Sequence, residues 1–518
     1  MSRSVPYTRE AVWTRSRVFW IDAAVVAVTI LPLLLTQHLP LADLPNHLAR
    51  MYILRDWHNS PNLQAFYVPH WALVPNLALE LFVLALRPVL SPDGAVRAFC
   101  IVTVLMLFLG TRSVNRAVSD GTATAYRVAP LLVYGGPFQY GFLSYCFGVG
   151  LALVAFGWYL RLRPLAGWRL PLVMALGFAL LLCHLAAFGL FALALGGCEL
   201  AAAFEASRGH WRRLPAEILR RQIAPVGCLV PVLAVFLLLS PTADPAMAAE
   251  NVVRFSTLQE KLRSVAAITL FTQPRLETAL LALALAGLAV ALVLRAVRVH
   301  RVLAFVVPLM ALLWLVLPNI AAHTSFIDYR LPWAISFFLL GGIVAGPSWH
   351  RYRSLLAAGF GTLAFARVTL IAVLWLRWEP TLAAIDHALS ELPPGVAMQV
   401  IQGKSPNGGA FRDPDLSNVA AYATARRSAF EPGIFASFAG QVIDFHGEAL
   451  QLWRQDGRAG ERPDHLDDLP PAYRYVLVLL PDTARIAPSL PLTCAASGPH
   501  FELLRVVPPE QATFRTRC

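Results

Sequence analysis

The sequence predicts an α-helical polytopic membrane protein that ends in a small extracytoplasmic α/β domain. Of its 518 residues, 57% are hydrophobic and only 14% are charged, and the mean hydropathy is +0.57. Soluble proteins carry charge on about a quarter of their residues. Apolar runs of about 17–20 residues recur along the chain, which is the length that a helix needs to cross the roughly 30 Å hydrocarbon core of a bilayer. The composition therefore predicts that lipid surrounds most of the chain.

Eleven apolar runs are long enough to be predicted as membrane spans. We place them at about 18–36, 96–112, 126–140, 142–160, 169–184, 185–204, 223–240, 277–295, 302–318, 331–347 and 354–375. An odd number of spans puts the two ends of the chain on opposite sides of the membrane. The predicted organisation is therefore a transmembrane domain over 1–375 and an α/β domain over 376–518.

The arginines predict the orientation of these spans. Segments assigned to the cytoplasmic side carry twenty Arg, whereas those on the other side carry eight Arg and Lys residues in total. An excess of basic residues in short loops marks the cytoplasmic side. This pattern places the amino terminus in the cytoplasm and residues 376–518 outside, in what we expect to be a bacterial inner membrane. It also accounts for the net charge of +12, so nucleic-acid binding is not indicated.

The first outward loop is predicted to run from about residue 38 to 95. Its segment 71–90 is apolar but contains Glu80 and Arg87. If this segment crossed the membrane, the basic loop 112–127 would lie outside, against the charge pattern. We therefore predict a helix that lies in the outer interface, as amphipathic segments do. Loops of this length in compact domains are usually functional, so we expect the working site here.

The segment beyond the last span contains strand patterns and two cysteines. GVAMQVIQG (395–403), YRYVLVLLP (473–481) and FELLRVV (501–507) are predicted to be strands separated by Pro/Gly turns. Cys494 and Cys518 are the only two of the seven cysteines outside the predicted spans. Because the outer compartment is oxidising, we predict a disulfide between them. Two unpaired thiols are the alternative.

The strongest candidate site is LPLADLPNHLARMYILRDWH, residues 39–58. Asp43 follows the first span, and Pro45 suits the first turn of a helix. On that helix His47 and Arg50 stand three residues apart and face the same side. One interpretation makes Asp43 a general base and Arg50 a phosphate ligand. The other makes Asp43 a simple N-cap and Arg50 an anchor to lipid headgroups.

Other polar residues lie at the predicted outer boundary of the membrane. HTSFIDYRLP (323–332) contains His323, Asp328 and Arg330. Arg330 either binds phosphate or pairs with Asp328. His184, between two apolar runs, is either a substrate ligand or a histidine bonded to backbone at a helix end. No spacing of Cys and His suits zinc and no phosphate-binding loop is present, so no cofactor is expected.

The order of these elements resembles the C-type membrane glycosyltransferases, which include protein O-mannosyltransferases and the aminoarabinose transferase of lipid A. The resemblance rests on Asp43 of DLPNH after the first helix, on the segment 74–97, and on the basic end of the next helix at Thr111–Arg116. The chain differs from the family pattern at two places. A single acidic residue replaces the usual pair, and His184 stands where a Lys-Gly pair often follows a helix.

The resemblance implies transfer of a sugar, with inversion, from a polyprenyl-phosphate-linked donor to a lipid or glycan acceptor on the outer face of the membrane. It implies that Asp43 acts on the acceptor hydroxyl, and it does not indicate a divalent metal because the second acid is absent. The expected substrate-binding residues are His47, Arg50, His184, His323, Asp328 and Arg330. The alternative is a non-catalytic or transport protein, such as a lipid-glycan flippase or a polysaccharide assembly factor. Few charged residues lie in the predicted spans, which favours the enzyme.

Overall fold

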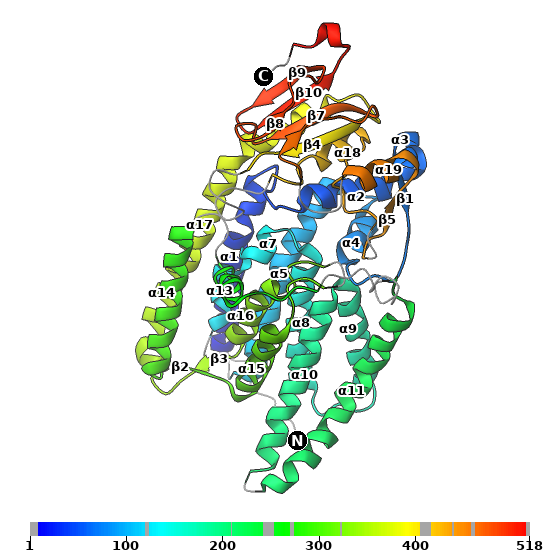
Figure 1. Cartoon of the computed structure of the whole chain (residues 1–518). Coiled ribbons are helices and arrows are strands. Elements are labelled where there is room, and N and C mark those ends of the chain that lie inside the picture. Colours follow the sequence, from blue (N-terminus) through cyan, green and yellow to red (C-terminus); the bar gives the residue numbers. More distant parts are fainter. Residues whose placement is uncertain are drawn as a thin grey trace.

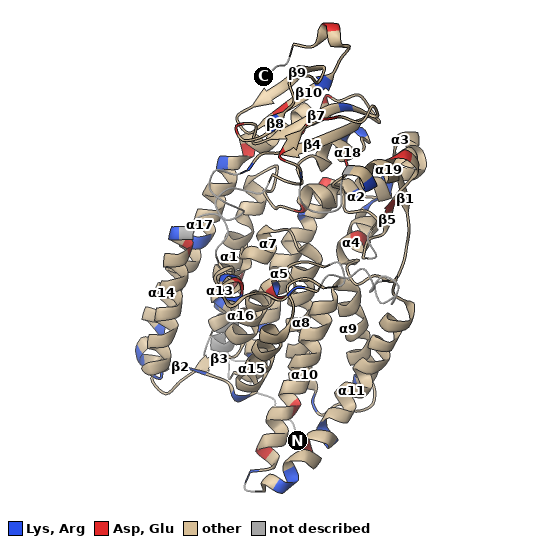
Figure 2. Ribbon diagram, in the orientation of Figure 1, with Lys and Arg blue, Asp and Glu red and all other residues tan. Residues whose placement is uncertain are grey.

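The computed structural model describes residues 9–119, 124–208, 210–241, 253–269, 274–321, 324–404, 416–437, 440–456, 462–513 and 518. A long bundle of helices carries a small mixed sheet and short helices at one end (Figure 1). We call the described part of residues 391–518 the cap. Most charged residues lie toward the two ends of the bundle or in the cap (Figure 2), as expected for helices surrounded by lipid.

Seven helices in the described residues are long and apolar enough to cross a membrane, judged by length and composition. They correspond to α1 (Arg9–Leu35), α5 (Pro92–Val118), α8 (Leu143–Leu162), α10 (Leu185–Ala206), α11 (Leu214–Leu239), α14 (Pro274–Val293) and α17 (Trp349–Ser390). Two shorter apolar helices, α9 (Arg169–Cys183) and α15 (Arg301–Val316), pack against α10. The chain is therefore a multi-pass membrane protein, as its composition predicted.

One predicted span, 126–140, is broken into short pieces rather than forming one helix. The pieces are η2 (Ala125–Val128), α6 (Pro130–Val133) and α7 (Gly136–Gln139). Pro130 and Pro137 each lie at the start of a new helix, because proline has no N–H to continue the preceding one. The prediction of a continuous helix was wrong here.

A second predicted span, 331–347, contains a helix that is too short to cross a bilayer alone. α16 (Leu331–Gly341) has 11 residues and is followed by β3 (Ile343–Ala345), which pairs with β2 (Val297–Val299). The other nine predicted spans each contain one long or intermediate helix. The total of eleven crossings stays a prediction.

The first outward loop is folded. It contains α2 (Leu44–Asp56), η1 (Trp57–Asn59), α3 (Pro61–Phe66), β1 (Tyr67–Pro69) and α4 (Ala78–Leu86). The helix predicted within 71–90 is α4, which has nine residues. At 1.5 Å per residue it is about 13 Å long and cannot cross a bilayer. The segment is therefore not a span, as the charge pattern predicted.

The cap contains a four-stranded sheet in the order β4-β7-β10-β9, in which β4 and β7 are parallel and the other pairs are antiparallel. Its strands are β4 (Ala397–Gln402), β7 (Tyr473–Leu479), β9 (Leu492–Gly498) and β10 (Phe501–Val506). The three predicted strands correspond to β4, β7 and β10. The disulfide between Cys494 and Cys518 is present, as predicted, and ties β9 to the last residue.

The cap is joined to the membrane bundle in two ways. First, α17 continues as one helix to Ser390, so the predicted domain boundary at 375/376 lies inside a helix. Second, the cap packs on the first outward loop: β1 pairs with β5 (Ile443–Phe445), and α18 (Ala421–Arg427) packs on α2. Figure 1 shows these elements side by side at the cap end of the bundle. The loop that holds Asp43 therefore lies between the bundle and the cap.

Candidate active site

Asp43 lies between α1 and α2, in the N-cap position of α2. Its side chain makes no capping hydrogen bond to that helix, so the interpretation of Asp43 as a simple N-cap is wrong. Its backbone N–H donates to the carbonyl of Tyr140 (2.9 Å), and the side chain of Asn418 donates to its carboxylate (3.2 Å). The turn before α8 and the cap thus both contact Asp43.

A glycine lets Asp43 approach this turn. Gly141 has a φ of +87°, and a Cβ at this position would lie 3.1 Å from the Cβ of Asp43. His47 Nε2 donates to the Gly141 carbonyl at 3.0 Å. Burial, followed by the charge of Arg50, lowers the pKa of His47 to about 3, so its ring is neutral. The structure therefore gives His47 the role of supporting the turn beside Asp43, and this role differs from the predicted substrate contact.

Arg330 contacts the same turn. Its guanidinium carbon is 3.8 Å from the centre of the Phe142 ring, and its backbone carbonyl accepts from the Tyr145 hydroxyl at 2.9 Å. Burial lowers the pKa of Arg330, whereas Tyr145 and then Asp43 act in the opposite direction. Asp43 bonds Tyr140, and Arg330 contacts Phe142, two residues further along. The structure thus places these two predicted residues at one turn.

The guanidinium of Arg330 has more N–H donors than its described neighbours have acceptor atoms for them. Its Nη2 donates to the carbonyl of Ser325 (3.1 Å), and its Nε is buried without a partner in the described part of the chain. Its Nη1 lies 3.0 Å from His184 Nε2, while the N–H of Ala186 donates to His184 Nδ1 at 3.1 Å. A neutral imidazole has one acceptor nitrogen and cannot accept both bonds. A ligand with several acceptor oxygens, such as a phosphate, would supply the missing acceptors.

Aromatic rings lie beside Arg330 and stack on one another. Tyr140 stacks on Phe142 and on Phe326, with ring centres 5.3 Å apart in each case. Phe326 is 38% exposed and has a φ of +62°, which is strained for a bulky side chain. A cation beside aromatic faces gains electrostatic stabilisation that partly offsets its loss of water.

Arg50 does not join this site. It forms an ion pair with Glu80 of α4, and both side chains are only 1% exposed. Two of its nitrogens have no partner among the described residues, but an anion placed there would meet the Glu80 carboxylate. The structure therefore does not support the predicted role of Arg50 as a phosphate ligand, because a buried carboxylate already neutralises it.

The second predicted cluster separates in the structure. Asp328 pairs with Lys261 (2.8 Å) and accepts from the side-chain amide of Asn319 (2.8 Å), so the alternative pairing of Asp328 with Arg330 is not found. Asp328 thus has bonding partners other than Arg330. His323 lies outside the described residues.

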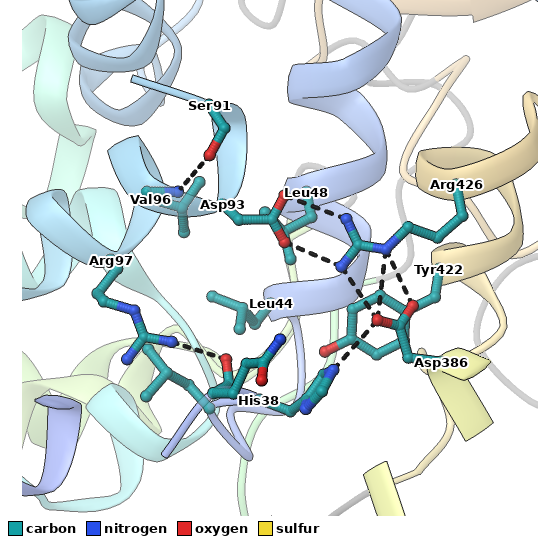
Figure 3. Close-up of a pocket in the computed structure, with 13 residues that line it drawn as sticks. His38, Leu44, Leu48, Ser91, Asp93, Val96, Arg97, Asp386, Tyr422 and Arg426 are labelled. Atoms are coloured by element: carbon teal, nitrogen blue, oxygen red, sulfur yellow. Dashed lines mark hydrogen bonds and ion pairs between the residues drawn. The ribbon is translucent and has the colours of Figure 1, made fainter. Parts of the chain in front are cut away.

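A cluster of ion pairs connects the cap to the bundle (Figure 3). Arg426 of α18 bonds Asp93 of α5 (2.9 Å) and Asp386 of α17 (3.0 Å). His38 lies 3.1 Å from Asp386 through Nε2 and 2.8 Å from Glu379 through Nδ1. We call these five residues the cap clasp. They connect the end of α1, the start of α5, α17 and the cap.

A pocket of about 380 Å³ lies beside the cap clasp. Leu44 and Leu48 line it from α2, together with Arg97 from α5 (Figure 3). Arg97 donates to the carbonyls of Thr36 (2.7 Å) and Gln37 (2.6 Å) and so completes the end of α1. The pocket lining does not include Asp43, His184 or Arg330. Because its charged groups bond one another or backbone, we assign it to the attachment of the cap.

Sequence reasoning missed Asn418, Phe142 and Tyr145. Asn418 is 375 positions from Asp43, and no sequence pattern connects the two. Phe142 directly precedes α8 and Tyr145 lies in its first turn, and no sequence pattern connects either residue with Arg330. In the described residues, no three His, Cys, Asp or Glu side chains gather closely enough to hold a metal ion.

Comparison with known proteins finds the same fold in a membrane enzyme. No protein-family model and no curated protein sequence matches this chain. The crystal structure of ArnT from Cupriavidus metallidurans in the apo state matches 96% of this chain and 99% of its own, with a TM-score of 0.53 and 13% identity. The structure of the same protein bound to undecaprenyl phosphate matches 94% and 98%, with a TM-score of 0.50 and 14% identity. The expected resemblance to C-type glycosyltransferases is thus confirmed at the level of the fold, over nearly the whole chain.

Proposed function

We propose that this protein transfers a sugar from a polyprenyl-phosphate-linked donor to an acceptor at the outer face of a bacterial cytoplasmic membrane. The observation that carries the proposal is that Asp43 and Arg330 both contact the turn at residues 140–142, Asp43 through Tyr140 and Arg330 through Phe142. One offers a carboxylate and the other offers donors without acceptors. The shared fold adds support, because one ArnT structure holds undecaprenyl phosphate.

The proposed reaction is a single displacement at the anomeric carbon. The acceptor hydroxyl oxygen attacks this carbon, and the bond from the carbon to the phosphate oxygen breaks. Polyprenyl phosphate leaves with the electron pair, and the hydroxyl proton passes to Asp43. A positioned base contributes about 10²–10⁴-fold to such a reaction. One displacement inverts the configuration of the sugar.

Arg330 would hold the phosphate as its negative charge grows. A guanidinium presents a planar fork of donors that matches phosphate oxygens and makes strong charge-assisted hydrogen bonds. His184 would assist, because a ring that accepts the Ala186 N–H at Nδ1 carries its proton on Nε2, beside Arg330. Donors that are in place before the reaction stabilise the leaving group without having to reorganise.

The sidedness of the reaction follows from the positive-inside pattern of the arginines. We propose that the cap and the first outward loop face the periplasm or exterior, where a lipid or glycan acceptor would meet the donor. Both substrates would reach the site from the membrane or its surface. Holding two reactants side by side is itself worth up to about 7–11 kcal/mol.

The test is transfer by the full chain in lipid nanodiscs. The donors would be undecaprenyl-phosphate-linked pentoses and hexoses whose sugar carries a label. A bacterial lipid extract would supply the acceptor. The proposal predicts two matched products, free undecaprenyl phosphate and a newly labelled acceptor. The proposal would be contradicted if neither product formed with any donor in the panel.

The alternative, transport of a lipid-linked sugar, gives a different result in sealed liposomes. A transporter moves the labelled lipid from one leaflet to the other and leaves its sugar–phosphate bond intact. Movement without release of undecaprenyl phosphate would therefore favour transport. Release without net movement would favour the transferase.

A further inference from the structure

The carboxylate of Asp43 is bonded by a residue of the cap. Asn418 Nδ2 donates to Asp43 Oδ1 at 3.2 Å and to the carbonyl of Ala42 at 3.1 Å. We infer that Asn418 is a positioning residue, which fixes the Asp43 carboxylate in the orientation that the reaction needs. The inference rests on the proposed function and adds to it a role for the cap.

The direction of this hydrogen bond is fixed by a backbone N–H group that is linked to Asn418 through one other side chain. The N–H of Phe435 donates to Asn46 at 3.1 Å, and since a backbone N–H is always a donor, the atom that receives it is the amide oxygen of Asn46. The amide nitrogen of Asn46 must then face Asn418, to which it donates at 2.7 Å. The oxygen of Asn418 accepts this bond, so its nitrogen faces Asp43. This chain of hydrogen bonds from Phe435 through Asn46 and Asn418 to Asp43, which we call the relay, leaves Asn418 one orientation, with its donor on the carboxylate.

The relay is built for rigidity. Asn46 is fully buried, and its amide nitrogen also lies 3.3 Å from the carbonyl of Gly433. Asn46 is on α2, three residues after Asp43. One turn of helix therefore holds both the residue that orients Asn418 and the residue to which Asn418 donates. Asn418 and Gly433 belong to the cap, which α18 packs onto α2. Movement of the cap relative to α2 would break the bond to Asp43.

Asp43 must be held in one orientation to act as a base. Its side chain makes no capping bond to α2, so the backbone alone does not select its rotamer. A base must meet the acceptor hydroxyl at hydrogen-bond distance and in line with the proton. Small misplacements of catalytic groups reduce rates by up to about 10²-fold. A donor on one carboxylate oxygen limits rotation and favours the ionised form that accepts a proton.

The experiment compares Asn418→Ala with Thr424→Ala in the full chain. Thr424 is a buried residue of α18 whose hydroxyl donates to the carbonyl of Ala429 at 2.8 Å and lies 3.4 Å from the Tyr67 hydroxyl, so the control also loses buried hydrogen bonds of the cap. We expect kcat to fall about tenfold or more for Asn418→Ala and less than twofold for the control. KM for the polyprenyl-phosphate donor should change less than threefold in both, because Asn418 does not contact the Arg330 side of the site. Thermal unfolding would confirm that both variants are folded.

A second variant, Asn418→Asp, gives a signature that a purely structural role would not produce. At neutral pH it places a second carboxylate against Asp43, and activity should fall below that of Asn418→Ala. Two adjacent carboxylates share one proton as the pH falls, since like charges disfavour double ionisation. The introduced carboxyl can then donate to Asp43 as the amide did. The activity of Asn418→Asp relative to wild type should therefore rise as pH falls below about 6, whereas that of Asn418→Ala should stay flat.

The outcomes separate the two proposals. Two results with an active wild type would overturn the role of Asn418 and leave the transferase proposal intact. One is an Asn418→Ala protein with the same kcat as Thr424→Ala, and the other is an activity of Asn418→Asp relative to wild type that does not change with pH. Wild type that transfers no sugar with any donor in the panel would overturn the proposed function, and the role of Asn418 with it. If Asn418→Asp fails to fold, the kcat and KM values of Asn418→Ala still decide the question.

Discussion

At the scale of residues, the chemistry depends on how each charged group is partnered. Arg330 and Arg50 were both predicted to bind phosphate, and both are arginines near the outer boundary. Arg50 is enclosed with Glu80, whereas Arg330 is half-buried beside Phe142 and His184. The difference between the two is made by a carboxylate 30 positions away in the sequence, which no local pattern reveals.

Replacing Arg330 tests its role in holding phosphate. Arg330→Lys keeps the positive charge but loses the planar fork of donors. We expect transfer to fall about 10–100-fold for Arg330→Lys and further for Arg330→Gln, measured as release of undecaprenyl phosphate. The matched control is Arg254→Gln, since Arg254 is an exposed arginine paired with Glu260. Equal activity of Arg330→Gln and the control would contradict the assignment.

Replacing the Arg50–Glu80 pair tests the opposite role. Glu80→Leu leaves a buried guanidinium without its partner, which typically costs about 3–5 kcal/mol. Changing both residues, as Arg50→Met with Glu80→Leu, removes both charges and should restore most of the lost stability. Thermal unfolding measures the stability, and the folded double variant should retain transfer. A stable double variant without transfer would show that Arg50 binds substrate after all.

The sequence predicted part of this site for a physical reason. Ionisable groups at the edge of hydrocarbon are costly unless they are used or paired, and this reasoning selected Asp43, His184 and Arg330 from three separate segments. It also selected Asp328, whose partner Lys261 becomes visible only in three dimensions. Asn418 was missed because a neutral amide in a polar segment carries no comparable signal.

At the scale of elements, the cap clasp determines how the cap is held over the active site. Burial lowers the pKa of His38, but the hydrogen bonds and charges of Asp386 and Glu379 outweigh it and raise the pKa above 6.5. A group whose pKa is raised by folding adds stability that is fully present below its unfolded-state pKa. That contribution is lost as the pH rises through the folded-state pKa of His38. The cap clasp is therefore strongest in mild acid.

His38→Asn tests this pH dependence. The gap in thermal stability between wild type and His38→Asn should be widest below about pH 6.5 and should narrow as the pH rises toward 9. The control is His465→Asn, because His465 is an exposed histidine of the cap that is not part of the cap clasp. The prediction would be contradicted by a gap that is constant with pH or that widens on the alkaline side.

Helix lengths show where apolar runs mislead. The run 126–140 is hydrophobic enough to suggest a span, yet Pro130 and Pro137 divide it into helices of four residues each. Hydropathy measures the affinity of a segment for an apolar environment, and the interior of a helix bundle is as apolar as lipid. The strands at 395–403, 473–481 and 501–507 were predictable because turns bound them on both sides.

At the scale of the whole molecule, the orientation in the membrane can be tested by labelling. Lys404 of the cap is 82% exposed, and Arg220 near the start of α11 is 67% exposed. The five free cysteines of the described chain are buried, so a new surface thiol should react selectively. In intact cells, a membrane-impermeant maleimide should label Lys404→Cys at once and Arg220→Cys only after permeabilisation. The reverse pattern would overturn the predicted sidedness.

The most direct test of the central claim is the activity of Asp43→Asn in the full chain in nanodiscs. Asparagine keeps the size of the side chain and an oxygen that can accept the bond from Asn418, but it cannot take a proton. Since Asp43 makes no capping bond to α2, thermal stability should stay near that of wild type. Release of undecaprenyl phosphate should fall about 10²-fold or more, the range for losing a general base. A folded Asp43→Asn protein that transfers sugar at nearly the wild-type rate would show that Asp43 is not the base.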